Sequence, residues 1–171
     1  SAAAGATVSP EILDRLVGNY RIGPGTVARI TRDGNDLFFT GFGPRARLTP
    51  QSDSVFVPAS FPFTFRFSSG KDGPRVLVDG MGMTEPVGRL AATPRLTPAQ
   101  LAQYAGRFQS AELDTWAVVE ASGDSLRIRT RWGPWQRLEP LAPDVFLSGG
   151  IELTFDRDRS RRVTGFRLSA A

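Results

Sequence analysis

The chain has 171 residues, of which 40% are apolar, 22% charged and 10% aromatic, as is typical of a folded globular domain. It contains no Cys and no His, which excludes disulfides, Cys- or His-ligated metals and imidazole acid–base chemistry. The formal net charge of +4 is modest, and we interpret it as favouring solubility rather than nucleic-acid binding. No apolar run is long enough to predict a membrane span, and no residue pattern predicts a metal site or a cofactor.

An internal duplication organises the chain. Residues 42–57 align with residues 132–147 at an offset of 90, with seven identities in 16 positions. The Ser9-Pro10 pair matches Thr97-Pro98 at an offset of 88, and residues 63–65 align with 153–155 at an offset of 90. Because the order of these blocks is preserved, we predict two homologous units, residues 9–91 and 97–171, joined by a linker at 92–96.

Within each unit, a short helix comes first. Ser9 and Thr97 are good N-cap residues, and Pro10 and Pro98 suit the first helical position. Short strand-like runs separated by Gly, Pro, Asn and Asp turns follow. The predicted strands of the first unit are 19–22, 26–31, 36–40, 46–49, 54–57, 63–67, 75–79 and 87–91. Those of the second unit are 106–109, 115–120, 125–130, 136–139, 145–147, 152–156 and 163–168.

This arrangement predicts an all-β fold made of two tandem small antiparallel β-barrels. Seven or eight short strands in about 80 residues suit a closed or nearly closed barrel. Such a barrel is filled by its own side chains or holds at most a small ligand.

The second unit has no counterpart of the predicted strand 87–91, so we expect its barrel to lack the closing strand. The two strand edges would then carry unpaired backbone groups. Three arrangements remain open: segment 2–8 fills the gap, another chain fills it, or the edge stays open and shielded. We favour the second and third, because segment 2–8 is rich in Ala and Gly, which are poor strand formers.

A family resemblance rests on three stretches of the second unit. They are the helix that runs into Tyr104-Ala105-Gly106-Arg107-Phe108, the run Phe155-Asp156-Arg157-Asp158, and Val163-Thr164-Gly165-Phe166. Residues 10–169 resemble the lipocalin-like β-barrel domains, some in tandem, that follow the catalytic domain of bacterial serine hydrolases. These hydrolases are of the penicillin-binding, class C β-lactamase and D-aminopeptidase kind.

The resemblance implies a non-catalytic accessory region. Such a region would pack against a serine hydrolase domain and shape its active-site entrance, or would mediate oligomerisation by self-association. It also implies a bacterial protein in the periplasm or outside the cell. The alternative is a free-standing periplasmic or secreted binder of a small hydrophobic ligand.

The catalytic pattern of those hydrolases has only a formal match here. Ser68-Ser69-Gly70-Lys71 fits Ser-x-x-Lys, but its composition predicts a hairpin turn with no helix to present the serine. We therefore predict no catalytic residues and no enzymatic activity for this chain.

Candidate binding residues lie in the second unit. Arg127, Arg129 and Arg131 alternate along one predicted strand and share a face, which indicates either an anion or partner-protein patch or a solvated barrel exterior. Trp132 and Trp135 flank a Gly-Pro turn. Because the counterpart of Trp132 is the aromatic Phe42, we interpret Trp132 as structural and Trp135 as the candidate interface anchor or stacking residue.

Two further patterns concern the barrel interiors and turns. The first unit has a phenylalanine-rich wall, which indicates either a packed core or a cavity for a hydrophobic molecule; its members are Phe56, Phe61, Phe63, Phe65 and Phe67. Two glycines recur at equivalent places, which predicts a positive φ or a close backbone approach at each; the pairs are Gly18/Gly106 and Gly43/Gly133.

Overall fold

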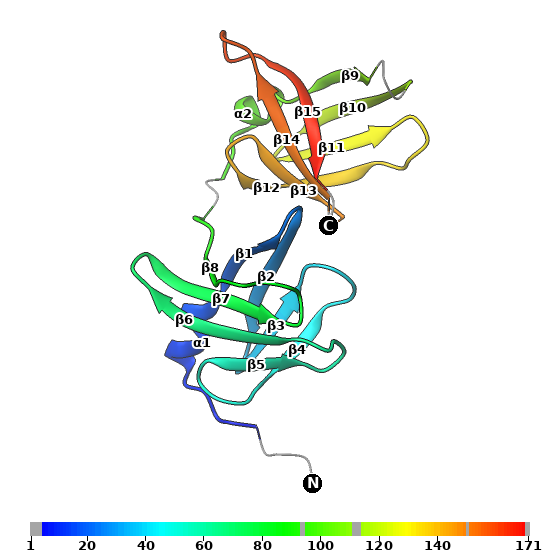
Figure 1. The fold of residues 1–171 in the computed structure, drawn as a ribbon. Helices are drawn as coiled ribbons and strands as arrows, with labels where there is room; N and C mark the ends of the chain where they lie inside the picture. Colours follow the sequence, from blue (N-terminus) through cyan, green and yellow to red (C-terminus); the bar gives the residue numbers. More distant parts are fainter. Residues whose placement is uncertain (1–4, 93–94, 111–113, 150, 170–171) are drawn as a thin grey trace. The chain divides into compact units, whose positions relative to one another are not determined.

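The computed structural model describes residues 5–92, 95–110, 114–149 and 151–169. The fold is all-β with two short helices, and the chain divides into two compact units at the boundary between Ala91 and Ala92 (Figure 1). Residues 93–94 of the predicted linker lie outside the described residues.

The first unit is an eight-stranded antiparallel barrel in which each strand pairs with the next along the chain. The barrel closes where Arg89, just after the last strand, bridges Tyr20 in the first strand. Its elements are α1 (Pro10–Leu16), β1 (Gly18–Gly23), β2 (Thr26–Asp33), β3 (Asp36–Thr40), β4 (Ala46–Pro50), β5 (Val55–Pro58), β6 (Thr64–Gly70), β7 (Gly73–Asp79) and β8 (Val87–Gly88).

The second unit repeats this order with seven strands. Within the described residues, no strand pairs with the outer edge of its first or last strand. The elements are α2 (Pro98–Ala102), β9 (Gly106–Ser110), β10 (Thr115–Ser122), β11 (Ser125–Thr130), β12 (Gln136–Ala142), β13 (Val145–Ser148), β14 (Ile151–Arg157) and β15 (Val163–Ser169).

The N-terminal segment does not fill the open position beside β15. The Ala6 N–H donates a hydrogen bond to the Pro50 carbonyl at 3.1 Å, and Val8 is buried in the core of the first unit. The first of the three predicted arrangements is therefore wrong for residues 5–8, the described part of that segment.

Side-chain caps start both helices, as the sequence predicts. The Ser9 hydroxyl accepts a hydrogen bond from the Ile12 N–H at 3.4 Å. In the second unit the Thr97 hydroxyl accepts from the Gln100 N–H, while the Gln100 side chain accepts from the Thr97 N–H, which is a complete capping box. The first helix buries Leu13 and Leu16 against its barrel, and the second buries Leu101.

Strand register shows which residues of the two units are equivalent. The predicted alignment of 63–65 with 153–155 is wrong by two residues. Phe56 pairs with Phe65 in the first unit, whereas Phe146 pairs with Leu153 in the second, which makes Phe65 equivalent to Leu153. The chain between β13 and β14 is shorter than the segment 59–63 between β5 and β6, and this shortening moves the register.

Backbone hydrogen bonds support the same equivalence further along the strand. The Phe67 N–H donates to the Ser54 carbonyl at 2.7 Å, and the Phe155 N–H donates to the Asp144 carbonyl at 2.8 Å. Phe67 and Phe155 are therefore structural counterparts, as are Ser54 and Asp144.

The phenylalanine-rich wall of the first unit is a packed core. Four of its five predicted members are buried, and the Phe61 ring packs against them. The Phe39 ring joins them, with its centroid between 5.1 and 6.0 Å from those of Phe42, Phe61, Phe63 and Phe65.

The glycine prediction holds at some positions and fails at one. Gly43 has a φ of +72°, and a Cβ at Gly18 would collide with the Arg89 side chain. A Cβ at Gly133 would lie 2.8 Å from the Thr130 hydroxyl oxygen. Gly106 has no positive φ, and the nearest atom to an added Cβ is 3.6 Å away, so the prediction is wrong there.

Candidate cavity and cationic face of the second unit

The barrel of the second unit holds a cavity of about 410 Å³. Side chains from all seven strands line it, and none of the lining residues is charged. They are Phe108, Gln109, Thr115, Trp116, Ala117, Ile128, Thr130, Gln136, Ser148, Ile151, Leu153, Thr164, Gly165, Phe166 and Leu168.

Smaller side chains at the positions of first-unit phenylalanines account for this space. By strand register, Ile128 takes the place of Phe39 and Leu153 that of Phe65. The shorter connection before β14 removes the segment that carries Phe61 in the first unit. Protein interiors are normally close-packed, and the structure around a smaller side chain relaxes only in part. The volume that the larger phenylalanine rings occupy in the first unit therefore remains unfilled in the second.

Trp132, the residue aligned with Phe42 of the first unit, does not fill the cavity. Its side chain is 86% exposed, whereas Phe42 packs against the core of the first unit. Its predicted structural role is therefore wrong: among the described residues, no counterpart of the Phe61 segment covers the ring.

A polar pair lies in the cavity wall, formed by buried Ser148 and exposed Gln136. The Ser148 hydroxyl donates to the Gln136 side-chain oxygen at 3.0 Å, and Ser148 is only 4% exposed. The first unit has Ala46 and Pro58 at these positions, which carry no polar side-chain atom. The second unit thus combines apolar walls with one hydrogen-bonding group of neutral character.

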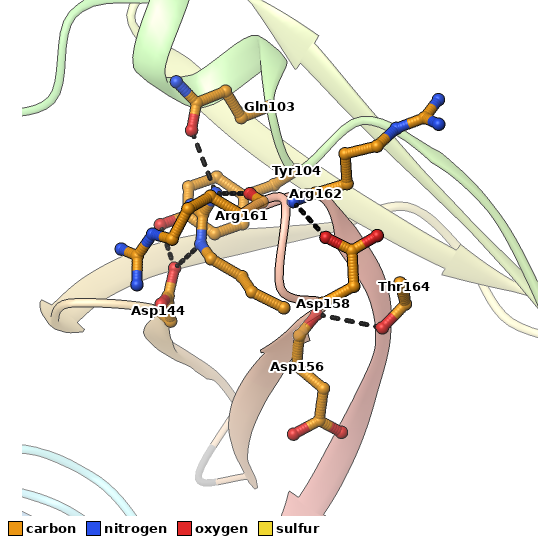
Figure 2. Close-up of polar contacts among 9 residues, drawn as sticks. Gln103, Tyr104, Asp144, Asp156, Asp158, Arg161, Arg162 and Thr164 are labelled. Carbon is orange, nitrogen blue, oxygen red and sulfur yellow. Dashed lines mark hydrogen bonds and ion pairs between the residues drawn. The ribbon is translucent and has the colours of Figure 1, made fainter.

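A polar network closes the opposite end of the barrel, beside α2 (Figure 2). Strand β14 runs from the cavity to Arg157 at this end. The Asp144 carboxylate accepts hydrogen bonds from the Tyr104 hydroxyl and from Arg157 Nε, both at 2.8 Å. Arg157 Nη1 donates to the Gln103 side-chain oxygen at 3.1 Å and to the Arg161 carbonyl at 2.7 Å.

Burial and hydrogen bonding shift the titration of this network. Burial raises the pKa of the Tyr104 phenol, and its hydrogen bond to Asp144 raises that pKa further. Burial by itself would raise the pKa of the Asp144 carboxyl, but the hydrogen bonds from Arg157 and Tyr104 and the charge of Arg157 outweigh it, so the pKa lies below its usual value. Asp144 and Arg157 are therefore both charged at neutral pH, and their ion pair links β14 to the turn before β13.

Between β9 and β15, the barrel wall is held by rings rather than by a strand ladder. The Phe108 and Phe166 ring centroids are 5.4 Å apart, and both rings also contact Phe155. Phe108 and Phe166 line the cavity as well. The seam between the two edge strands is therefore part of the cavity wall.

Three of the four predicted binding residues come together on the outside of the barrel. The Arg127 guanidinium carbon lies 4.3 Å from the centre of the Trp135 ring, and that of Arg129 lies 4.9 Å from it. Arg131 falls just past the end of β11 and stacks on Trp132 instead, at 4.8 Å. Trp116, which the sequence reading did not single out, joins the set through Arg129 at 6.0 Å.

The formal Ser-x-x-Lys match lies on a β-hairpin. Ser68 is exposed and lies in β6, where its backbone pairs with that of Arg75 in β7. It therefore belongs to the strand rather than to the predicted turn. Lys71 lies in the turn between β6 and β7. No helix presents this serine. Among the described residues, no group of three Asp or Glu side chains is placed to hold a metal ion.

Comparison with known proteins adds no assignment: no protein-family model matches the sequence, and neither does any curated protein. No helix in the described part of the chain combines the length and the apolar character that a membrane span requires.

Proposed function

We propose that the second unit binds a small, uncharged and largely apolar molecule inside its barrel. The observation that carries this proposal is the uncharged cavity of about 410 Å³ at a place where the first unit has packed phenylalanines. Small-molecule sites are typically concave, apolar and about 300–1,000 Å³ in volume, with a few polar groups that orient the ligand. The Gln136–Ser148 pair would supply those groups.

The ligand chemistry follows from the lining. A charged group inside the cavity would lose its hydration without meeting an opposite charge, which is costly. A hydroxyl or carbonyl group would exchange hydrogen bonds with Gln136 and Ser148. In this proposal the first unit is a filled companion barrel, and the protein acts by binding, not by catalysis, in the periplasm or outside a bacterial cell.

The experiment combines native mass spectrometry of the purified chain with titration of the neutral fluorescent probe N-phenyl-1-naphthylamine. The test variant is Ile128→Phe with Leu153→Phe, which restores the first-unit residues. We expect at least about tenfold weaker probe binding, equivalent to about 1.4 kcal/mol. The control is Thr154→Phe, which adds a ring on the outward side of β14. Equal binding by the two variants, or no binding by the parent chain, would show that the proposal is wrong.

A second candidate function rests on the resemblance over residues 10–169. In that case the two barrels are the accessory region of a serine hydrolase of the β-lactamase-related kind, and shape its active-site entrance or mediate oligomerisation. The full-length gene tests this directly: an upstream helix-borne Ser-x-x-Lys domain supports it, and a signal peptide directly before residue 2 contradicts it.

A further inference from the structure

Five side chains form a continuous ladder on the outer face of β9–β12. Trp116 has the guanidinium groups of Arg107 and Arg129 near its ring, at 4.8 and 6.0 Å. Trp135 has those of Arg129 and Arg127, at 4.9 and 4.3 Å. Arg129 therefore links the two indole rings, and the ladder crosses the face from β9 to the start of β12.

The first unit has the same stacking contact with its partners exchanged. There the Arg45 guanidinium lies 3.6 Å from the centre of the Phe38 ring. Arg45 and Phe38 occupy the positions of Trp135 and Arg127. The first unit has this cation–π contact between β3 and the residue before β4, and the second has it between β11 and the residue before β12. The contact is therefore a feature of the barrel, and the units differ in the charged residues around it.

The first unit neutralises its arginines on this face. Arg47 pairs with Asp36 at 2.7 Å, and Arg45 lies 3.9 Å from Asp33. The β10–β11 hairpin has serines at both acidic positions: Ser122 pairs with Ser125 in the register in which Asp33 pairs with Asp36.

Loss of these carboxylates leaves arginines of the second face without ion pairs, although the formal charge of the two faces is equal. Over the outward positions of β1–β4 and of β9–β12, four Arg and two acidic residues give +2 in each unit. The charged residues compared are Arg21, Arg29, Asp33, Asp36, Arg45 and Arg47 with Arg107, Glu120, Arg127, Arg129, Arg137 and Glu139. Arg127 pairs with Glu120 at 2.7 Å, and no ion pair is found for Arg107, Arg129 or Arg137 in the described part of the chain.

We propose that this face binds an acidic peptide segment of a partner protein. Guanidinium groups stacked on indole rings keep their N–H edges directed outward, and those edges fit carboxylates in a two-point manner. Arg127 donates from both Nε and Nη2 to the Glu120 carboxylate, at 3.1 and 2.7 Å. Arg107 and Arg129, which lie in register with Val118 between them, are therefore the two anchors for peptide carboxylates on this face.

Single-stranded nucleic acid fits this face less well. Its binding without sequence preference relies on bases that stack on free aromatic rings. Trp116 and Trp135 already have two guanidinium neighbours each, so a base would have to displace an arginine from its ring.

Fluorescence anisotropy with a labelled octaglutamate peptide tests this inference on the full chain. The first test variant is Ser122→Asp with Ser125→Asp, which restores the first-unit carboxylates. The second is Arg129→Thr, which restores Thr40 of the first unit and removes the link of the ladder. We expect each to weaken binding by at least about tenfold, and we expect added salt to weaken binding by the parent chain. The control lies in the exposed connection between β14 and β15: Arg159→Ser removes one positive charge, as Arg129→Thr does, and Arg159→Ser with Arg162→Ser matches the change of two charges in the double variant.

Binding that is lost in both test variants and retained by the control supports the proposal. Equal loss in the control would reduce the effect to net charge and overturn it. Tighter binding of an oligothymidylate than of octaglutamate would also overturn it, as would absence of peptide binding by the parent chain. Trp116 belongs to both the ladder and the cavity lining, so N-phenyl-1-naphthylamine binding is measured in every variant to detect any change of the cavity that accompanies a change of the face.

Discussion

Replacement of Asp144 by serine, its counterpart in the first unit, should destabilise the second unit selectively. The change removes the acceptor of hydrogen bonds from Tyr104 and Arg157, both 2.8 Å long. It also leaves the Arg157 guanidinium, which is 12% exposed, without its carboxylate.

The magnitude follows from these contacts. A hydrogen bond to a charged group contributes about 1.5–3 kcal/mol, and removal of one partner of a buried ion pair costs about 3–5 kcal/mol. Because Asp144 is 25% exposed, water recovers part of this loss. We therefore expect the free energy of unfolding of the second unit to fall by about 3 kcal/mol.

The tryptophans make the measurement specific to that unit. All three, Trp116, Trp132 and Trp135, belong to the second unit, so tryptophan fluorescence during urea denaturation follows its unfolding alone. Asp124→Ser in the exposed β10–β11 turn is the control and should change the free energy of unfolding by less than about 0.5 kcal/mol.

A double variant separates the ion pair from the fold. Adding Arg157→Ser to Asp144→Ser removes the uncompensated charge and should recover part of the lost stability. A loss below about 1 kcal/mol for the single variant, or a further loss of the same size in the double variant, would refute the assigned role of the network.

Three further predictions use the same chain. Since the folded pKa of Asp144 is lowered, its contribution to stability is present above its unfolded pKa and is lost as the pH falls through the folded value; urea titrations across the acid range should show this loss in the parent chain and not in Asp144→Ser. Gly43→Ala should destabilise the first unit by about 1 kcal/mol because of the positive φ, whereas Gly106→Ala should change stability by less than about 0.5 kcal/mol; equal thermal midpoints by circular dichroism would contradict the glycine argument. The purified chain should not hydrolyse nitrocefin or D-amino-acid anilides, and turnover that disappears in Ser68→Ala would show the opposite.

Local sequence signals predicted the elements well because they act over a few residues. The Ser9 and Thr97 caps, the proline that follows each, and the turn glycines depend on nearby backbone groups. The duplication then extended each local prediction to a second place in the chain. The all-β barrel fold follows from these signals without knowledge of any long-range contact.

The register of β14 was not predictable in the same way. Leu153-Thr154-Phe155 matches both 63–65 and 65–67 as an alternation of apolar and polar residues, because a shift by two residues leaves the side-chain pattern of a strand unchanged. Only pairing across the sheet, which depends on the length of the preceding turn, distinguishes the two alignments.

The candidate sites depend on contacts between distant residues. The cavity exists because Ile128 and Leu153, 25 positions apart in the sequence, are both smaller than their counterparts. The Arg–Trp ladder was visible as Arg127, Arg129 and Trp135, but Trp116 lies on a separate strand and joins them only in the folded sheet. A comparison of the two units position by position would have indicated both, given the correct register.

The seam between β9 and β15 has a consequence for hydrogen exchange. In the first unit, Arg89 and Leu90 donate backbone hydrogen bonds to the carbonyls of Pro74 and Asn19, and so tie β7 to β1. In the second unit, Thr164 is the counterpart of Pro74 and Arg107 that of Asn19. Both lie on strand edges that no strand pairs with in the described residues. Local opening should therefore cost least at this seam, and its amides should exchange before those of β11–β13. A molecule held between Phe108 and Phe166 would slow that exchange, so the protection of these amides would report occupancy of the barrel without any label on the ligand.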